Sequence, residues 1–486
     1  MKKAFVFLLF LLTIGFAGTA QVQPFQTGDR IAFVGNSITE QGYYESYIWL
    51  YYMLHFPNRR IVILNRGIGG DRAQNIYDRF DDDVAHSEPT VICLTFGMND
   101  SGYFEFLRAN ADSVARVHVA ESRHYFELIE EKMKTLSKVK KIMILGSPFD
   151  ETAKIKGANN FPGKVRVMEE IAGFQAQAAK DNHWGLVDFL HPMTEIDLRD
   201  QQKDSTFTLT GNDRIHPGNS GHFVMAWLFL KTQGLDHSPV ADMAIDAGAL
   251  HVDRADNCRI TDLAAAKGAI GGGAVSAASA GAGSAAGSAA GTGIRFDYLA
   301  NSLPFPVDTV PRLWGNPHRQ SEAVEVMPFY SEFNREMLRV SGLSAGTYEL
   351  RIDDHRIAKF TAAELGEGIN LAKLTNTPEY EQAMAVLQLN EERMGLESKM
   401  RAYYWLQFDY LRGIGRKFQD DEIAMDSVNK TAAKDWAVAS KRDNYRAARY
   451  PAVRAAWQKE MDLLVNDMYT VNQPKMHRLE IRRLAE

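Results

Sequence analysis

A serine stands in a tight turn directly after the first short apolar run of the sequence. The run Ile31 to Val34 leads into Gly35-Asn36-Ser37-Ile38-Thr39, and Ser37 at the end of a buried strand could act as a nucleophile. A serine after a strand also commonly caps the helix that follows, so this motif is weak when taken alone. The residues that accompany Ser37 therefore decide the chemistry.

Two glycine-containing segments could supply hydrogen-bond donors to a reacting oxygen. Arg66 to Asp71 follows the second apolar run and contains Gly70, and Phe96 to Asp100 follows the third and contains Asn99. Glycine lets a backbone N–H approach an oxygen closely, and asparagine offers a neutral side-chain donor. Taken singly, Gly70 suggests only turn geometry and Asn99 only an Asx-turn. Together with Ser37 they could form an oxyanion hole.

A histidine with an aspartate three residues before it stands near the end of the same region. In Asn212-Asp213-Arg214-Ile215-His216-Pro217, Asp213 in a turn can reach the Nδ1–H of the His216 imidazole. That contact fixes the tautomer that leaves Nε2 free as a general base. One such pair is usually structural, but here it completes a set with Ser37, Gly70 and Asn99.

The elements around these residues predict where they lie. Amphipathic stretches, such as those around Phe126, Val167 and Phe223, alternate with short apolar runs. This alternation predicts an open parallel sheet with helices on both faces, whose ligands bind at the carboxyl ends of the strands. Five runs are typical of buried parallel strands: Ile31 to Val34, Ile61 to Leu64, Val91 to Phe96, Ile142 to Leu145 and Leu186 to Val187.

The four segments that contain Ser37, Gly70, Asn99 and His216, in this chain order, resemble the sequence blocks of the SGNH (GDSL) hydrolases. The resemblance covers residues 28–233. It implies a flavodoxin-like, three-layer α/β/α domain, which we place at residues 28–235. One departure is Asn36, where the GDS motif of the family has aspartate; that residue is not the triad acid, so the change would affect only the support of the turn. The four residues named by the family, with the triad acid, correspond to Ser37, Gly70, Asn99, His216 and Asp213.

The resemblance implies acyl transfer by a catalytic triad. His216 would take the proton of Ser37, whose oxygen attacks an ester carbonyl, while Asp213 stabilises the imidazolium. The N–H groups of Ser37 and Gly70 and the side chain of Asn99 would hold the oxyanion, and water would hydrolyse the acyl-enzyme. This chemistry needs no metal and no organic cofactor.

Three other patterns suggest chemistry that their surroundings do not favour. Gly342 to Gly346 fits G-x-S-x-G, but strand-like sequence on both sides predicts a hairpin turn rather than a nucleophile elbow. Gly67-Ile68-Gly69 resembles a dinucleotide motif whose third glycine position holds Arg72. Asp81 to Asp83 would point in different directions on a helix, which predicts a solvated face rather than a cation site.

The character of the chain changes beyond Gly234. Residues 240–375 contain short strand-like pieces with turn-rich connections and predict a small β-rich module. Within it, residues 264–293 are almost entirely Ala, Gly and Ser, which predicts a disordered loop. Residues 376–486 predict a helical C-terminal region, in which Pro451 should bend or break the second of two long helices.

Four aromatic residues of this helical region allow two interpretations. They could line a platform for sugar rings, but an aromatic stripe at helical spacing is more often core packing, which we favour. The residues are Trp405, Phe408, Trp436 and Trp457.

The N-terminus predicts export. Lys2 and Lys3 precede an apolar run that ends at Ala17, and small residues follow up to Ala20, as in a bacterial secretory signal. The run is shorter than the roughly 20 residues that a spanning helix needs. We therefore expect residues 1–20 to be a cleaved signal peptide and the protein to be secreted or periplasmic, without a membrane anchor.

Charge and cysteine content exclude some classes of protein. The formal net charge is −6, and no basic patch indicates nucleic-acid binding. Cys93 and Cys258 are too few for a disulfide framework or a cysteine-based metal site. Cys93 lies in an apolar run, which favours a buried, inert thiol.

These observations predict a serine esterase that removes short acyl groups, most simply acetyl, from carbohydrates. The loops after the first three strands offer little apolar surface for a long acyl chain, and their side chains suit hydroxyl-rich ligands. Two alternatives are a lipase or lysophospholipase of the same family and a non-catalytic glycan-binding protein on the same fold. The polar loop residues are Glu40, Gln41, Asp71, Arg72, Asp100 and Ser101, and the tyrosines that could stack on sugars, or simply pack, are Tyr43, Tyr44 and Tyr103.

Overall fold

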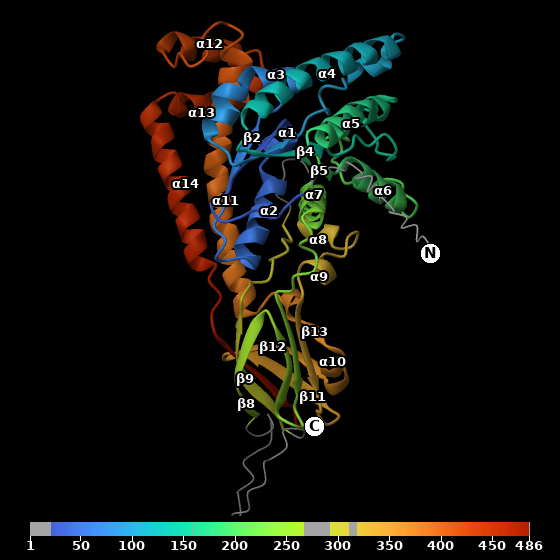
Figure 1. The fold of residues 1–486 in the computed structure, drawn as a ribbon, viewed down its shortest axis with the longest axis vertical. Coiled ribbons are helices and arrows are strands. Elements are labelled where there is room, and N and C mark those ends of the chain that lie inside the picture. Colours follow the sequence, from blue (N-terminus) through green and yellow to red (C-terminus); the bar gives the residue numbers. More distant parts are fainter. Residues whose placement is uncertain (1–20, 158, 267–291, 311–317, 486) are drawn as a thin grey trace, which may run out of the picture.

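The protein is elongated, with an α/β domain at one end and a β-module at the other (Figure 1). Two long helices connect these ends. The predicted signal peptide, residues 1–20, lies outside the part of the chain that the structure describes. The computed structural model describes residues 21–157, 159–266, 292–310 and 318–485.

The α/β domain contains a five-stranded parallel sheet in the order β2-β1-β3-β4-β5. The ends of β1 and β2 lie side by side, because Gly35 pairs with Gly67. This sheet confirms the predicted parallel α/β fold. Its strands are β1 (Arg30–Gly35), β2 (Val62–Gly67), β3 (Val91–Leu94), β4 (Lys140–Leu145) and β5 (Gly185–Asp188).

Helices cover both faces of this sheet, because successive side chains of a strand point to opposite faces. Ile31 and Phe33 pack in the core beneath α2, α6 and α7, whereas Ala32 and Val34 pack in the core beneath α3, α4 and α5. The continuous apolar runs are therefore buried on both sides. The helices are α1 (Ser37–Glu40), α2 (Tyr43–His55), α3 (Ala73–Arg79), α4 (Ala111–Thr135), α5 (Lys164–Asp181), α6 (Leu190–Asp200) and α7 (Asn219–Thr232).

The β-module is a sandwich of two sheets, in the orders β13-β10-β6-β7 and β12-β11-β14-β9-β8. One hydrophobic core joins the two sheets. The short helix α10 (Ala362–Glu367) packs on this sandwich, whereas α8 (Gln320–Ala323) and α9 (Phe329–Glu332), between β9 and β10 in the chain, pack in the core of the α/β domain. The strands are β6 (Ala241–Asp246), β7 (His251–Asp256), β8 (Cys258–Ala265), β9 (Gly293–Ala300), β10 (Glu336–Ser341), β11 (Thr347–Ile352), β12 (His355–Thr361), β13 (Ile369–Asn370) and β14 (His477–Arg483).

The sandwich corrects two predictions. Gly342 to Gly346 is not a hairpin turn, because β10 and β11 belong to different sheets and this segment crosses between them. The predicted loop 264–293 is shorter at both ends, since Ala265 in β8 pairs with Ile294 in β9. Residues 267–291 of that loop lie outside the described residues.

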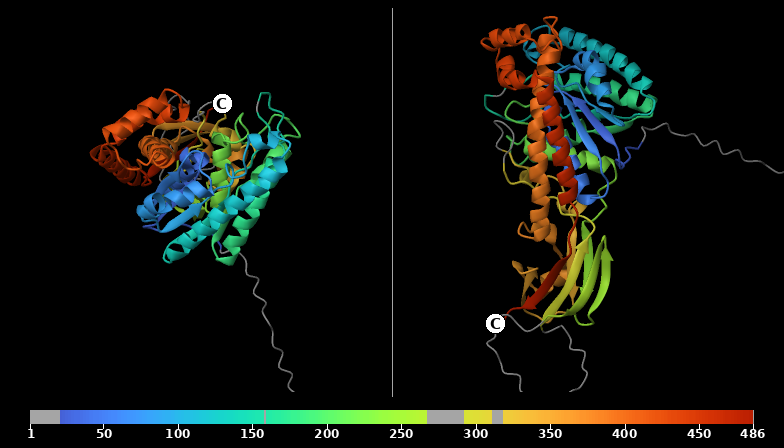
Figure 2. Two further views of the ribbon diagram at one scale, coloured as in Figure 1. Left: turned by 90° about the horizontal axis from the view of Figure 1, so that it is seen from above. Right: turned by 90° about the vertical axis from the view of Figure 1, so that its left-hand side faces the viewer.

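The C-terminal region consists of two long helices and two shorter ones. The long helices α11 and α14 run side by side from the β-module to the α/β domain (Figure 2). Pro451 is the first residue of α14, so the helix breaks where it was predicted to bend or break. The helices are α11 (Pro378–Trp405), α12 (Glu422–Ala432), α13 (Trp436–Ala448) and α14 (Pro451–Val471), and a π-helical turn, η6 (Leu406–Leu411), follows α11.

The predicted helical region 376–486 is wrong in its last part. After α14 the chain returns to the β-module and adds β14 between β9 and β11. Leu479 and Ile481 of this strand are buried in the sandwich core. Their alternation with charged residues is the strand pattern that the prediction missed.

Of the predicted solvated face of Asp81 to Asp83, Asp81 and Asp82 are exposed, but the prediction is wrong for Asp83. Asp83 is buried and accepts hydrogen bonds from Nη1 of Arg79, at 2.6 Å, and from Nη1 and Nη2 of Arg401 in α11, at 2.9 and 2.8 Å. Burial raises the pKa of Asp83, but the Arg401 and Arg79 guanidinium groups outweigh it and hold the pKa well below its usual range. Asp83 therefore fastens α11 to the α/β domain.

Within the described residues, no helix combines the length and apolar character that a membrane span needs. Cys93 is buried in β3 and Cys258 is partly exposed in β8, and both are free thiols.

Candidate active site

Ser37, His216 and Asp213 form a continuous hydrogen-bonded chain. The Oγ of Ser37 lies 2.8 Å from Nε2 of His216, and Nδ1 of His216 lies 2.6 Å from Oδ2 of Asp213. The other carboxylate oxygen of Asp213 accepts the N–H groups of Ile215 and His216, both at 3.0 Å. The structure thus brings together the three residues whose order and spacing suggested a triad, in the geometry that a serine nucleophile requires.

The turn that carries Asp213 and His216 is held in an unusual backbone conformation. Arg214 has a φ of 64°, a region that non-glycine residues rarely occupy. Its buried guanidinium donates to the carbonyl of Asp150 at 2.9 Å, and its own carbonyl accepts the N–H of Asp150 at 3.1 Å. These contacts stabilise the turn and place both triad residues on the same side of it.

The environment of Asp213 favours its ionised form. Burial raises the pKa of this carboxyl, but the hydrogen bonds from the side chain and backbone of His216 outweigh it and hold the pKa below its usual range. An ionised Asp213 can stabilise the imidazolium that forms when His216 accepts a proton.

The nucleophile turn depends on a capping asparagine and a glycine of the neighbouring strand. Asn36 is the N-cap of α1, and its Oδ1 accepts the N–H of Ile38 at 3.0 Å, so asparagine supports the turn despite the departure from the GDS motif. A Cβ at Gly67 would lie 2.1 Å from the backbone nitrogen of Glu40. Only glycine at this position of β2 lets the turn pack against the sheet.

Gly70 and Asn99 lie beside Ser37 and could donate to an oxyanion. Gly70 has a φ of +90°, which favours glycine. Asn99 Nδ2 donates to the carbonyl of Asp71 at 2.9 Å, and Asn99 Oδ1 accepts from the Tyr103 hydroxyl at 2.7 Å. These two contacts fix which way the amide faces and leave its second N–H available.

A buried lysine that was not predicted from the sequence holds the loop of Asn99. Lys164 is 0% exposed, and its Nζ donates to the carbonyls of Met98 and Gly102, both at 2.6 Å, and to the Ser101 hydroxyl. The same Nζ lies 3.9 Å from the centre of the Tyr103 ring. Burial lowers the pKa of Lys164 to about 7. Lys164 begins α5 directly after Gly163, and nothing in the local sequence marks it as buried.

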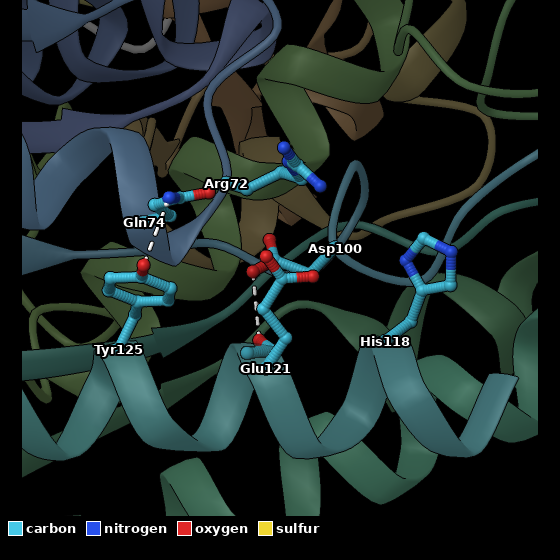
Figure 3. A pocket seen from close by; sticks show the side chains of 7 residues that line it. Arg72, Gln74, Asp100, His118, Glu121 and Tyr125 are labelled. Carbon is cyan, nitrogen blue, oxygen red and sulfur yellow. Dashed lines mark hydrogen bonds between the residues drawn. The ribbon is translucent and has the colours of Figure 1, made fainter. Parts of the chain in front are cut away.

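Two polar residues expected to face a ligand instead support the backbone. Figure 3 shows the Asp100 carboxylate directed toward α4, where Ser122 donates to it at 2.8 Å. Asp100 also accepts the N–H groups of Ala73 and Gly97, at 2.9 and 3.0 Å. Ser101 is buried against Lys164. Arg72 lines a small cavity of about 10 Å³ beside Asp100, and the lining of this cavity does not include Ser37, Asp213 or His216.

Other candidates for ligand contact are also buried. Asp71 accepts from Nε of Arg79 at 2.7 Å, and Tyr44 packs beneath the nucleophile turn, where its hydroxyl lies 3.0 Å from that of Thr39. The predicted hydroxyl-binding loops are therefore largely internal. Of the six polar residues expected there, only Glu40 and Gln41 line a hollow that includes Ser37.

Two hollows meet at the triad. The aromatic hollow has a volume of about 440 Å³ and is lined beside the catalytic groups by Tyr103, Phe104, Asn159, Phe161 and Ile215. Tyr103 and Phe104 follow β3, whereas Phe161 and Ile215 follow β4 and β5, so much of this apolar lining lies outside the three loops from which little apolar surface was expected. The helical-region hollow has a volume of about 790 Å³ and is lined by Glu40, Gln41, Gly69, Gly211, Asn212, Pro217, Trp405, Trp436, Ala437 and Lys441. Residues common to both are Ser37, Gly70, Asp213 and His216.

The favoured core-packing interpretation of the helical aromatics is therefore wrong for Trp436. It is 71% exposed and lines the helical-region hollow, whereas Phe408 is buried as expected. Trp405 packs partly on the helical core and partly lines the hollow. Trp457 is half-buried on α14.

Comparisons with known proteins match two parts of the chain. The GDSL-like lipase/acylhydrolase family matches residues 33–223, which include the triad. The diltiazem deacetylase C-terminal helical domain matches residues 384–473, from α11 to α14.

Solved and curated proteins show the same relationship. The structure of a gut microbial diltiazem-metabolizing enzyme is 40% identical, with a TM-score of 0.88, over 96% of this chain and 100% of its own. An acetylxylan esterase from Geobacillus stearothermophilus is 23% identical over 225 residues, which is 43% of this chain and 96% of the esterase. Its crystal structure, at 21% identity and a TM-score of 0.36, covers 43% of this chain and 95% of its own.

The nearly full-length match at 40% identity extends the relationship beyond the catalytic blocks to the β-module and the helical region. The matched acylhydrolase region contains the hydrogen-bonded Ser37, His216 and Asp213 at the meeting point of two hollows. The chain therefore belongs to the SGNH (GDSL) hydrolase family and is a carboxylic ester hydrolase.

Proposed function

We propose that the protein is a secreted serine esterase that removes acetyl groups, with Ser37 as nucleophile, His216 as base and Asp213 as triad acid. The observation that carries this proposal is the short chain of contacts from Ser37 Oγ through His216 to Asp213. The proposal of secretion rests on the N-terminal sequence alone. It predicts that the exported protein begins at Gln21, which N-terminal sequencing would test.

In the proposed mechanism, His216 Nε2 removes the proton from Ser37 as its oxygen attacks the ester carbonyl. The oxyanion then accepts the N–H groups of Ser37 and Gly70 and the free N–H of Asn99. Collapse transfers the proton from His216 to the leaving alcohol and leaves an acyl-enzyme. His216 next activates a water molecule, whose attack releases the acid and restores Ser37.

Acetyl is the proposed acyl group because the helical region matches that of a diltiazem deacetylase. The alternative of a lipase or lysophospholipase has one supporting observation, the apolar lining of the aromatic hollow by Phe104, Phe161 and Ile215. A longer acyl chain would bury more apolar surface there. Acyl-chain preference therefore separates the two functions.

An acetylated carbohydrate is the proposed natural substrate. The polar side chains of Gln41, Asn212 and Lys441 beside exposed indole surface suit a ring that carries hydroxyl groups. A second candidate is the deacetylation of diltiazem or a similar aromatic ester. The aromatic hollow and the 40% identity to a diltiazem-metabolizing enzyme favour it.

The proposal is tested with the purified mature chain and Ser37→Ala as the control. We expect kcat/KM to fall from acetyl to butyryl to octanoyl nitrophenyl esters, and acetate to be released from acetylated glycans. Diltiazem in a parallel reaction tests the second candidate. Preference for octanoyl without acetate release from any glycan or from diltiazem would favour the lipase, and binding of glycans without any turnover would favour the non-catalytic alternative.

A further inference from the structure

We propose that Trp436 and Trp405 form a platform in the helical-region hollow that stacks against a six-membered ring in the alcohol part of the ester. A pyranose and an aryl group both fit this description, since each presents a flat apolar face to an indole. This inference rests on the proposed esterase function and adds the part of the molecule that recognises the leaving group.

The first observation is the exposure of Trp436. At 71%, it is the most exposed large apolar side chain among the described residues, and it forms part of the hollow that contains Ser37. Its backbone is fixed, because it begins α13 and the Asp435 side chain caps that helix by accepting the N–H of Val438 at 3.1 Å. An exposed indole at a capped helix start, in the same hollow as the proposed nucleophile, is suited to ligand contact.

The second observation is the fixed orientation of Trp405. Its Nε1 donates to the carbonyl of Gly69 at 3.0 Å, and the Nζ of Lys441 lies 4.5 Å from the centre of its ring. The hydrogen bond holds one edge of the indole against the loop of Gly70. Trp405 therefore lies beside the proposed oxyanion hole and lines the same hollow as Trp436.

The third observation concerns which part of the ester lies here. The helical-region hollow is the larger of the two, at about 790 Å³ against about 440 Å³. It combines aromatic surface with Glu40, Gln41 and Lys441, whereas the noncatalytic lining of the aromatic hollow is mainly apolar. An acyl chain is apolar and the alcohol part of a glycan or drug is larger and polar. The geometry therefore assigns the helical-region hollow to the alcohol.

The test measures how Trp436→Ala changes the preference of the protein among esters that share the acetyl group and differ in the alcohol. The substrates are phenyl acetate, a methyl xyloside carrying acetyl groups, and ethyl acetate, which has no ring. For at least one ring ester, we expect the ratio of kcat/KM to that for ethyl acetate to fall about 5-fold to 20-fold, chiefly through KM, since stacked aromatic contacts have about this effect. Trp436→Phe should restore part of the ratio.

Trp457→Ala is the matched control, because it makes the same change in the same region without touching either hollow. Its ratios should equal those of the unchanged protein, and thermal unfolding should show that each variant is folded. A fall for only one ring ester would support the platform and identify whether an aryl or a sugar ring binds it.

Equal losses for all three acetates would overturn the platform, as would unchanged ratios. A change that instead follows acyl length, in a comparison of phenyl acetate with phenyl butyrate, would also overturn it, since the wall would then hold the acyl group. These results leave the esterase proposal intact. By contrast, absence of turnover of every ester by the unchanged protein would contradict the proposed function itself.

Discussion

The indole nitrogen of Trp405 donates a hydrogen bond to the carbonyl oxygen of Gly69, 3.0 Å away and 336 positions earlier in the chain. Nearby, Nε of Arg401 donates to the carbonyl of Gly67, also at 3.0 Å. Helix α11 thus holds both ends of the short segment that leads to Gly70. The helical region is therefore a structural part of the proposed catalytic centre, and changes in it should affect catalysis.

Trp405→Phe tests this link because it removes the donor and keeps an aromatic ring. A hydrogen bond of this kind contributes about 0.5–1.5 kcal/mol, so we expect kcat for ethyl acetate to fall roughly 2-fold to 10-fold. The change in KM should be smaller, since the bond positions Gly70 rather than the substrate. An unchanged kcat in a folded variant would show that Gly70 keeps its position without this contact.

Ser37→Ala should fold normally and lose nearly all hydrolysis of nitrophenyl acetate. Loss of a triad nucleophile typically lowers kcat by about 10⁴-fold to 10⁶-fold. Thermal unfolding would verify the fold, and initial rates would measure the loss. Retention of more than a few per cent of the activity would remove Ser37 from its proposed role.

Asn99→Ala should lower kcat by roughly 10²-fold to 10³-fold with little change in KM, because an oxyanion donor acts mainly in the transition state. Tyr103→Phe removes only the hydroxyl that fixes the Asn99 amide and should have a smaller effect in the same direction. Steady-state kinetics on one acetyl ester compare the two variants. A pure KM effect in Asn99→Ala would make Asn99 a substrate-binding residue instead.

Lys164→Met should lower kcat because the carbonyls of Met98 and Gly102 lose their shared donor and the Asn99 loop loosens. Because the variant also leaves buried acceptors without a donor, the melting temperature should fall too. Lys164→Arg keeps the positive charge, but the larger guanidinium group does not fit the buried position of the Lys164 Nζ. Combining Lys164→Met with Asn99→Ala separates the two effects: a positioning role predicts that Lys164→Met lowers kcat much less once Asn99 is absent, whereas equal losses in both backgrounds would contradict it.

The buried carboxyl of Glu336 should make stability depend on pH. Glu336 is 1% exposed at the start of β10, and Tyr298 donates to it at 2.9 Å. Burial, followed by the nearby Glu379 carboxylate, raises the pKa of Glu336 to about 8. The folded protein therefore binds more protons than the unfolded chain between the ordinary glutamate pKa and about 8, so this group's contribution to stability is lost as pH rises through that interval.

Glu336→Gln removes this titration while keeping the acceptor for Tyr298. The melting temperature of the variant relative to the unchanged protein should therefore rise from about pH 5 to about pH 8.5. Calorimetry at several pH values would measure the difference. A constant difference across this range would show that Glu336 does not titrate there.

The proximity of the candidate catalytic residues was predictable because it follows from sheet topology. Ser37, Gly70 and Asn99 each follow a parallel strand, and the carboxyl ends of such strands meet at one edge of a sheet. Asp213 and His216 are close in sequence, so a turn suffices to join them. Short-range patterns of this kind can be read from a single sequence.

The second wall of the site was not predictable by the same reasoning. From the sequence alone, Asp83 resembles a surface carboxylate. Its burial depends on Arg401, which lies 318 positions later in the chain and donates to it in the folded protein. In the sequence, Trp436 does not differ from other aromatic residues of a helix. Its position in the hollow depends on how α13 packs near Ser37. The pairing of β10 and β11 with different sheets likewise depends on contacts that local sequence does not encode.

The position of β14 has a consequence for biosynthesis. Because this strand lies between β9 and β11, the larger sheet cannot close until residues 477–483 have left the ribosome. Helices α11 to α14 are thus inserted between strands of the β-module, and β9 and β11 each lack one neighbouring strand until β14 is made. Loss of the last ten or so residues would leave both neighbouring strands with an open edge, the form of a sheet most prone to aggregate. Completion of the larger sheet therefore depends on residues 477–483, far from Ser37.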